Sequence, residues 1–283
     1  MKNNLKTRII IALLALILAS LPAMARASEE STEDKITGEV AASVLSAYIW
    51  RGQELTRHSV VIQPSMTASY KGFTANVWGN LDTDPYSSAD GEYSSNFTET
   101  DVTLSYSKKF GMVQAGVGYI YYGLSGAAYG GTDLKDSQQV FVNLGLDTIL
   151  APTLTVYKEI DHYHQWYATL GISHTFALHE KVGLKLAAQA SYLKSEDAAT
   201  YPEFDSNSLA TDDRFNNFHD GMISVSLPIA VTGPLTITPT ATYVFPLSGD
   251  AEDEMKGRGL QGTIPSDRKG SFLYGGVILS FAF

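Results

Sequence analysis

The chain has 283 residues, with 30 acidic and 20 basic residues, a formal net charge of −10 and no cysteine. The absence of cysteine excludes a disulfide framework and a lipidated cysteine. The acidic balance argues against nucleic acid as a partner, because nucleic-acid binding relies on a cationic surface.

The first segment predicts export. Three basic residues within the first eight precede an unbroken apolar run at 9–19, and alanines at 23, 25 and 27 offer Ala-x-Ala cleavage sites. This layout is typical of a secretory signal peptide, and the run is shorter than the roughly 20 residues that a membrane-spanning helix needs. Cleavage would leave 16 basic residues and a net charge of about −14. Three segments are expected: a signal peptide at 1–27, a polar leader at 28–37 and one domain at 38–283.

After the leader, the chain alternates apolar and polar residues with a period of two, as half-buried strands do. In one segment, for example, Leu184 and Leu186 share a face, while Lys185 and Gln189 share the other. About twelve strands are predicted, an even number as in bacterial membrane barrels. Their expected ranges are 38–51, 59–70, 73–83, 97–109, 112–122, 137–147, 153–160, 165–177, 181–193, 218–231, 234–245 and 271–283.

The links between these strands mostly alternate between tight turns and longer polar loops, with short exceptions at 52–58 and 161–164. The links at 70–73, 108–112 and 231–235 are short, whereas those at 194–217 and 246–270 are long. Outer-membrane barrels have short periplasmic turns and longer extracellular loops. A soluble β-sandwich explains less well a polar face of Ser, Thr, Gln and Asn with few charges. The sequence therefore predicts an all-β, transmembrane, antiparallel up-and-down β-barrel in the bacterial outer membrane.

Aromatic residues mark the expected rims of the barrel. Tyr48 and Trp50 precede the first loop and are expected to face lipid at the outer interface, where such barrels carry an aromatic girdle. The last strand ends in "YGGVILSFAF", with Phe281 and Phe283 on one face. Outer-membrane proteins that resemble this one present such an aromatic end to the barrel-assembly machinery, so Phe281 and Phe283 are expected to be an assembly signal.

If Tyr48 and Trp50 face lipid, Arg51 points into the lumen, where it could pair with Asp82 or Asp101. Trp78 could stack on a ligand, although filling space in a narrow barrel is the favoured interpretation. Because residues of the lumen tune selectivity in barrels, six inward-facing residues are candidates for that role. They are Arg51, Trp78, Asp82, Asp101, Glu159 and Lys185.

Two polar clusters contain residue types that could bind a metal ion. His162 and His164, near Glu159, could hold a transition metal, and the acidic segment 248–259 could bind calcium, but neither matches a known ligand spacing. We interpret both as polar loops. Ser173 and His174 are adjacent and point to opposite faces of a strand, so they do not form a catalytic pair. We therefore expect no catalytic residues, no metal and no cofactor.

The stretch 46–84, "SAYIWRGQELTRHSVVIQPSMTASYKGFTANVWGNLDTD", resembles an N-terminal signature of a bacterial protein family, the Gcw_chp-like conserved hypothetical proteins. In that signature a Tyr-x-Trp/Phe-Arg-Gly element precedes a Gly-Phe turn and an aromatic-rich strand that ends in acids. The resemblance implies an outer-membrane barrel without an assigned reaction. The matching residues are Tyr48, Trp50, Arg51, Gly52, Gly72, Phe73, Trp78, Gly79 and Asp82.

Three functions follow as expectations. The first is a narrow, porin-like channel or passive transporter for small solutes. The second is a plugged structural or ligand-binding barrel whose loops contact lipopolysaccharide or a partner, because filling of the lumen decides conduction. An outer-membrane lipid hydrolase is the third and least favoured. The expected partners are outer-membrane lipid and lipopolysaccharide, the barrel-assembly machinery and a small solute.

Overall fold

The computed structural model describes residues 35–56, 59–85, 96–125, 135–260 and 269–283. The predicted signal peptide and most of the leader lie outside the described residues. The twelve long strands are β1 (Thr37–Leu45), β4 (Val61–Tyr70), β5 (Phe73–Asp82), β6 (Phe97–Phe110), β7 (Val113–Leu124), β8 (Ser137–Leu146), β9 (Thr153–Glu159), β10 (Gln165–His179), β11 (Val182–Ser195), β14 (Asn216–Ser226), β16 (Leu235–Pro246) and β17 (Phe272–Ala282). The short elements are β2 (Ile49–Trp50), β3 (Gln53–Glu54), β12 (Pro202–Phe204), β13 (Ala210–Arg214), β15 (Ile229–Ala230) and α2 (Gly249–Leu260).

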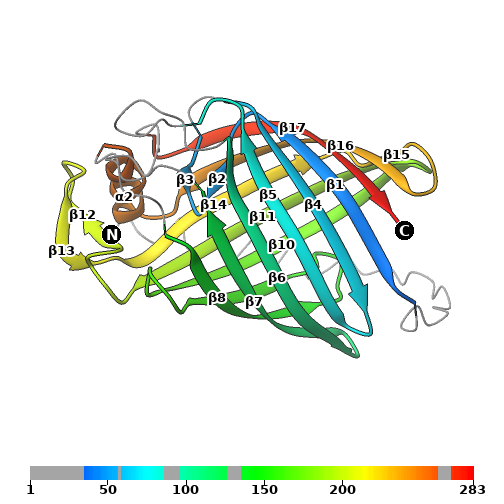
Figure 1. Cartoon of the computed structure of the whole chain (residues 1–283), viewed down its shortest axis with the longest axis horizontal. Coiled ribbons are helices and arrows are strands. Elements are labelled where there is room, and N and C mark those ends of the chain that lie inside the picture. Colours follow the sequence, from blue (N-terminus) through cyan, green and yellow to red (C-terminus); the bar gives the residue numbers. More distant parts are fainter. Residues whose placement is uncertain (1–34, 57–58, 86–95, 126–134, 261–268) are drawn as a thin grey trace, which may run out of the picture. The chain divides into compact units, whose positions relative to one another are not determined.

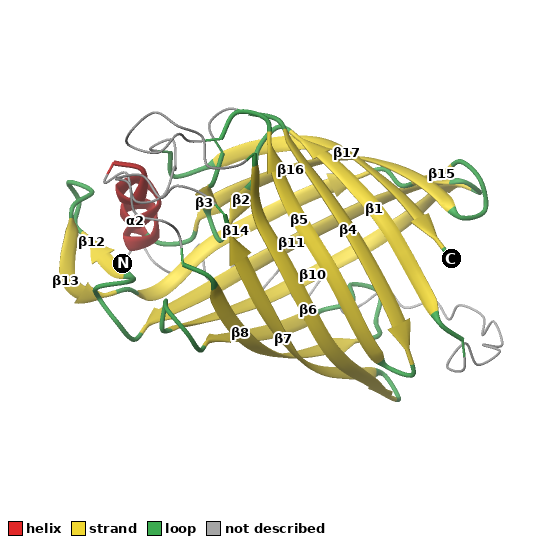
Figure 2. Ribbon diagram, viewed as in Figure 1, coloured by secondary structure: helices red, strands yellow, loops and turns green. Residues whose placement is uncertain are grey.

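The twelve long strands form a closed antiparallel ring (Figures 1 and 2). Each strand pairs with its neighbours along the chain, β10 pairs with β11, and β1 pairs with both β4 and β17. The pairing of β1 with β17 closes the ring, so the predicted up-and-down barrel is confirmed. Closure leaves no free sheet edge, which is what allows a sheet to cross lipid.

The strand register places apolar residues of neighbouring strands side by side on the outer face of the barrel. Val40 lies opposite Met66, Met66 opposite Val77, and Val77 opposite Val102. All four side chains are exposed. The alternate residues point inward and are mainly polar, among them the buried Gln63, Asn80 and Gln139. An apolar outside and a polar inside are the arrangement of a membrane barrel.

The tight turns at one end of the barrel have the backbone that their sequence predicts. Tyr70 pairs with Phe73 across a two-residue turn in which Lys71 has φ +50° and Gly72 φ +85°. Positive φ at both central residues defines a type I′ hairpin turn, which favours glycine at the second position. A side chain at Gly72 would also meet the backbone oxygen of Ser107 at 2.5 Å.

Two predicted strands differ from the structure. The strand predicted at 38–51 ends at Leu45, and the chain then turns into the separate hairpin β2–β3. The strand predicted at 218–231 divides into β14 and the short β15, with Leu227 and Pro228 between them. Proline lacks the N–H that a continuous strand would donate, which accounts for the second break.

Additional elements gather at the end of the barrel that carries the long loops. Figure 1 shows β12, β13 and α2 at that end, opposite the C-terminus. α2 is the only helix in the described part of the chain, and it occupies most of the acidic segment predicted to be a loop. Among the described residues, no helix is both long and apolar enough to cross a membrane.

Candidate functional site

The candidate site begins with a hairpin inside the barrel, which we call the inner hairpin (residues 49–54). Ile49 pairs with Glu54 and Trp50 with Gln53, so Arg51 and Gly52 form a two-residue tip. Their φ angles are +47° and +74°, the signs that a type I′ turn requires. The tip thus has the same turn type as Lys71 and Gly72, although it lies within the barrel instead of at its rim.

The inner hairpin places two predicted girdle residues inside the barrel. The ring of Tyr48 lies 5.5 Å from the ring of the inward-facing Trp78, and Trp50 lines an internal cavity. The prediction that Tyr48 and Trp50 face lipid is therefore wrong. The period of two extends through residue 50, but the strand ends at Leu45, so strand parity no longer determines direction.

Arg51 lies in the lumen, as predicted, and is surrounded by aromatic rings. Its guanidinium carbon is 4.3 Å from the ring centre of Tyr167, 4.5 Å from that of Trp50 and 5.6 Å from that of Tyr157. These are cation–π distances. Its Nη2 donates a hydrogen bond of 2.9 Å to Gln139 Oε1. The expected pairing with Asp82 or Asp101 is not found among the described residues, because the hairpin tip places the guanidinium against β8, β9 and β10.

A cavity of about 290 Å³ adjoins this tip. Its wall comes from the inner hairpin and from β7, β9, β10, β11, β14, β16 and β17, so the cavity lies within the ring of strands. Arg51 and Asp220 are the charged side chains in this wall, which is otherwise rich in aromatic residues. The aromatic members are Trp50, Tyr122, Tyr157, Tyr167 and Tyr274.

Two of the predicted acidic residues of the lumen have other partners. Asp82 accepts hydrogen bonds from the Ser59 hydroxyl and from the backbone N–H of Asp84. Glu159 accepts one from the Ser137 hydroxyl. Asp101 follows Glu99 by two residues on β6, and its Oδ1 is buried without a hydrogen-bond partner among the described residues. Asp82 and Glu159 are thus held by neighbouring hydroxyl and N–H groups.

The other two candidates lie apart from Arg51. Trp78 packs against Tyr48 on the inner face of β5. Lys185 is exposed near the turn end of β11, opposite Thr175. The structure therefore does not gather the six predicted residues into one site. Their role in selectivity stays a prediction.

The outer end of the lumen is covered by residues 200–215, which include β12 and β13, and by α2. We call these two segments the outer cover. Tyr201 and Phe215 form a buried apolar cluster with Leu193 and Tyr167 of the barrel wall, joined by Ala251 of α2. A second cluster joins Met255 of α2 to the barrel and to Ile49 of the inner hairpin. The outer cover is thus packed like a protein core against both the wall and the hairpin.

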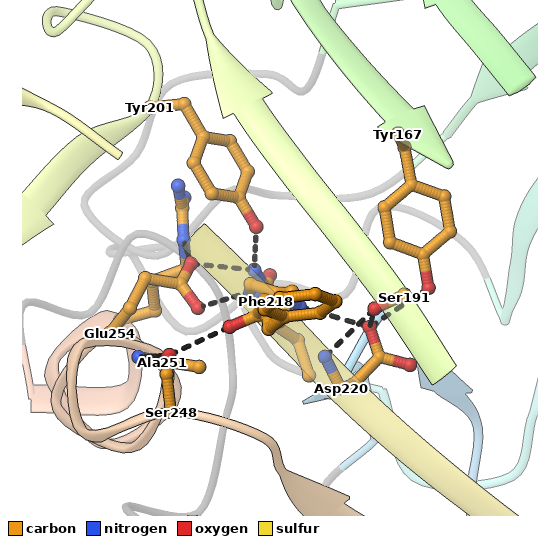
Figure 3. A network of polar contacts seen from close by, with 11 residues as sticks. Tyr167, Ser191, Tyr201, Phe218, Asp220, Ser248, Ala251 and Glu254 are labelled. Atoms are coloured by element: carbon orange, nitrogen blue, oxygen red, sulfur yellow. Dashed lines mark hydrogen bonds and ion pairs between the residues drawn. The ribbon is translucent and has the colours of Figure 1, made fainter. Parts of the chain in front are cut away.

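A buried polar network links the same elements (Figure 3). His219 Nε2 is 2.9 Å from Glu254 Oε2, and its Nδ1 is 2.9 Å from Asp220 Oδ1. Because a carboxylate faces each ring nitrogen, both nitrogens donate and the ring is an imidazolium. Arg258 donates to Glu254, one turn earlier on α2. Charges of alternating sign therefore run from the barrel wall into the helix.

Uncharged groups complete this network. Gln53 of the inner hairpin donates from Nε2 to the Tyr201 hydroxyl at 2.9 Å and to Glu254 Oε1 at 3.1 Å. On the barrel wall, the hydroxyls of Tyr167 and Ser191 donate to Asp220 Oδ1 at 2.8 and 2.7 Å. The inner hairpin, the outer cover and the wall are thus held together by hydrogen bonds that are buried on every side.

A β-bulge makes the network geometrically feasible. Ala190 pairs with Gly221 and Tyr192 with Phe218, so the single residue Ser191 faces both His219 and Asp220. Adjacent residues of a regular strand point to opposite faces, whereas a bulge can turn both toward one side. His219 and Asp220 are accordingly both buried.

The electrostatics of Glu254 follow from these contacts. Burial alone would raise the pKa of its carboxyl, but the positive charges of Arg258 and His219, together with their hydrogen bonds, hold that pKa below its usual value. For Arg258, burial would lower the pKa, but Tyr201 and Glu254 raise it. Both side chains of α2 are thus stabilised in their charged forms.

Sequence reasoning missed His219, Asp220 and Arg258, and it assigned Glu254 to a solvated acidic loop. One signal was available, because Glu254 and Arg258 are four residues apart, as are Glu252 and Lys256, and this spacing is favourable on a helix. In the described part of the chain, no three His, Asp or Glu side chains form a group that could hold a metal ion. His162 Nδ1 instead lies 3.3 Å from Asp161 Oδ1.

The closed ring, the apolar outer face and the polar lumen define the class: a twelve-stranded β-barrel of the outer-membrane type. Within that class, residues 27–158 match Gcw_chp, a family described as a bacterial protein of unknown function, which confirms the resemblance seen in the sequence. The match includes the inner hairpin. No curated protein sequence matches the chain.

Solved structures of other barrels are similar to this chain at low identity. A NanC porin is 10% identical, with 87% of this chain and 98% of the porin covered and a TM-score of 0.48. LpxR from Salmonella typhimurium is 8% identical, with 86% and 99% covered and a TM-score of 0.48. The translocator domain of the autotransporter NalP from Neisseria meningitidis is 9% identical, with 98% and 95% covered and a TM-score of 0.37.

Proposed function

We propose that the protein is a plugged outer-membrane barrel that takes up a small solute from its turn side, and not a permanently open channel. The observation that carries this proposal is the filling of the outer lumen. Six side chains from the wall, the inner hairpin and the outer cover have no exposed surface there. They are Gln53, Leu193, Phe215, His219, Glu254 and Met255.

The turn side of the lumen differs from the filled side. Its inward-facing residues are mostly small and polar, such as Ser105, Thr155 and Ser224, and all three are partly exposed. Short turns lie on the periplasmic side in barrels of this type. This distribution supports entry of a solute from the periplasm as far as the cavity beside Arg51.

The arrangement of hydroxyl and imidazole groups supports binding over hydrolysis. Ser191 donates to Asp220, and both nitrogens of His219 face carboxylates. A serine nucleophile needs a free base within hydrogen-bond reach, and His219 is already occupied. We therefore propose a function without a chemical step.

A narrow gated channel is the second candidate. The observation that favours it is that much of the filling of the outer lumen comes from loop segments, namely the inner hairpin and the outer cover. Displacement of the outer cover and the inner hairpin would join the turn-side lumen to the outside. The predicted roles of Arg51, Asp82 and Lys185 in selectivity, and contacts of the outer cover with lipopolysaccharide, belong to this proposal.

Conductance of the full chain in planar bilayers separates these functions. We expect the folded wild-type protein to show no steady conductance. A variant in which short Gly-Ser linkers replace residues 47–56, 200–215 and 249–260 should conduct, because the inner hairpin and both segments of the outer cover are removed. Steady, porin-like conductance of the wild type would contradict the plugged barrel. Opening only under applied voltage or at altered pH would favour the gated channel.

A further inference from the structure

The cavity inside the barrel carries one positive charge that no acidic side chain neutralises by direct contact. Arg51 lines the cavity and makes its hydrogen bond to the neutral side-chain oxygen of Gln139. Its Nη1 is buried and has no hydrogen-bond partner among the described residues. A guanidinium can donate five hydrogen bonds, and two parallel ones match the two oxygens of a carboxylate.

Among the described residues, the nearby acids do not pair with Arg51. Glu99 and Asp101 are not among the residues that line the cavity, and Glu159 accepts a hydrogen bond from the Ser137 hydroxyl. Asp220, which also lines the cavity, receives hydrogen bonds from Tyr167 and Ser191 and faces His219. Among the residues that line the cavity, Arg51 is the one basic side chain. An anion that enters the cavity could therefore accept hydrogen bonds from the Arg51 guanidinium, because no carboxylate among the described residues already accepts them.

The rest of the cavity wall suits the apolar part of a ligand. Ile49, Ile120, Met222 and Val244 line the cavity together with its aromatic residues. The Tyr122 hydroxyl donates to Gln139 at 2.9 Å, and the Tyr167 hydroxyl donates to Asp220. The polar ends of these two tyrosines are thus already occupied. Aromatic surfaces with satisfied hydroxyls favour contact with a planar or apolar ligand.

The volume limits the size of the ligand. At about 290 Å³ the cavity is near the lower end of the roughly 300–1,000 Å³ typical of ligand pockets. We infer that this cavity binds a small monocarboxylate with an aromatic or apolar body, whose carboxylate lies on Arg51. The inference rests on the proposed function, because the ligand must reach the cavity from the turn side.

Calorimetric titration of the full chain in detergent with benzoate tests the inference, with benzyl alcohol and benzylamine as uncharged and cationic analogues. We expect benzoate to bind at least about ten-fold more tightly than either analogue, because only the carboxylate meets Arg51. Arg51→Gln should weaken benzoate binding by about ten-fold or more and leave benzyl alcohol binding unchanged. The matched control Arg214→Gln changes an exposed residue at the end of β13, which does not line the cavity, and should leave benzoate binding unchanged.

Three results would overturn the inference: no binding of benzoate, equal binding by wild type and Arg51→Gln, or preference for benzylamine. Unchanged benzyl alcohol binding by Arg51→Gln shows that the cavity survives the substitution. The bilayer measurement distinguishes a failure of this inference from a failure of the proposed plugged barrel. A non-conducting barrel that ignores benzoate contradicts only the inference. An open barrel that binds benzoate contradicts only the plugged function.

Discussion

At the scale of single residues, the tip of the inner hairpin depends on one glycine. Gly52 has φ +74°, and a Cβ atom there would lie 3.1 Å from Met255 Cε and 3.2 Å from Asp220 Cβ. The residue therefore combines a left-handed backbone with close approach to both the outer cover and the barrel wall. These two demands explain why glycine follows Arg51 at the tip.

We predict that Gly52→Ala destabilises the folded barrel by about 1–2 kcal/mol, the cost of a left-handed conformation for a residue with a Cβ atom. The matched control is Gly233→Ala, because a Cβ at Gly233 meets no atom within 4 Å. Urea titration in detergent, followed by electrophoretic mobility, measures the difference. Equal midpoints for the two variants would show that the tip does not require glycine.

The location of Arg51 shows which structural features a sequence pattern can predict and which it cannot. The lumen position was predicted from strand parity, and the residue does lie in the lumen, but a hairpin turn brings it there. Arg51-Gly52 and Lys71-Gly72 share a basic-glycine pattern and a type I′ turn. Sequence alone did not distinguish a turn that joins two wall strands from one that folds inward, because that depends on tertiary packing around Tyr48 and Trp50.

At the scale of elements, α2 is fixed to the barrel by Glu254. The carboxyl faces His219 on the wall and Arg258 on its own helix, and it also accepts from Gln53. Neither the helix nor its buried face was predicted, because the acidic composition of 248–259 suggested a solvated loop. The i,i+4 spacing of Glu254 and Arg258 was the available signal for a helix. The partner of Glu254 on the barrel wall, His219, lies on a distant strand, so only the fold reveals it.

We predict that Glu254→Gln loosens α2 strongly. Removal of the negative charge leaves His219 and Arg258 as two buried positive charges, and breaking a buried pair in this way costs about 3–5 kcal/mol. Glu252→Gln is the matched control, since its exposed pair with Lys256 contributes about 0–1 kcal/mol. Amide hydrogen exchange over residues 249–260 reports the effect. Similar protection in both variants would mean that the apolar contacts of Met255 hold the helix without the charge.

The same carboxyl predicts the acid sensitivity of the outer cover. Because the folded state lowers the pKa of Glu254, its contribution to stability is complete above pH ~4.3, the usual value for glutamate. That contribution is lost as the pH falls further, through the lowered pKa. Protection of α2, corrected for intrinsic exchange, should therefore persist at mildly acidic pH and fall in stronger acid. Glu254→Gln should lack this dependence, and an identical pH profile for both proteins would contradict the assignment.

At the scale of the whole barrel, closure is made by the last residue of the chain as well as by strand pairing. The backbone N–H of Gly38 donates to the Phe283 oxygen at 2.8 Å, and the Phe283 N–H donates to the Gly38 oxygen at 2.9 Å. The Phe283 ring covers Gly38 so closely that a Cβ there would lie 2.5 Å from it. The seam between β1 and β17 was predicted, because alternation in "YGGVILSFAF" and in the first strand continues to the ends.

We predict that deletion of Phe283 lowers the yield of assembled barrel, because it removes both hydrogen bonds to Gly38 and the aromatic terminal residue. Phe283→Tyr keeps the backbone and the ring, and it serves as the control. The folded fraction in isolated outer membranes, measured by heat-dependent mobility, should fall for the deletion only. Normal yield after deletion would contradict a role of Phe283 and Phe281 in assembly.

The inner hairpin also has a consequence for the order of events during folding. It belongs to the first loop, whereas α2 belongs to the last, and Gln53 lies beneath Tyr201 and Glu254. Once α2 has packed, the hairpin can no longer enter from the outer mouth. We therefore predict that the first loop, which also comes first in the chain, takes its place in the lumen before α2 packs. A chain permuted to begin after β4 would reverse that order, and its hairpin would arrive at an entrance already occupied.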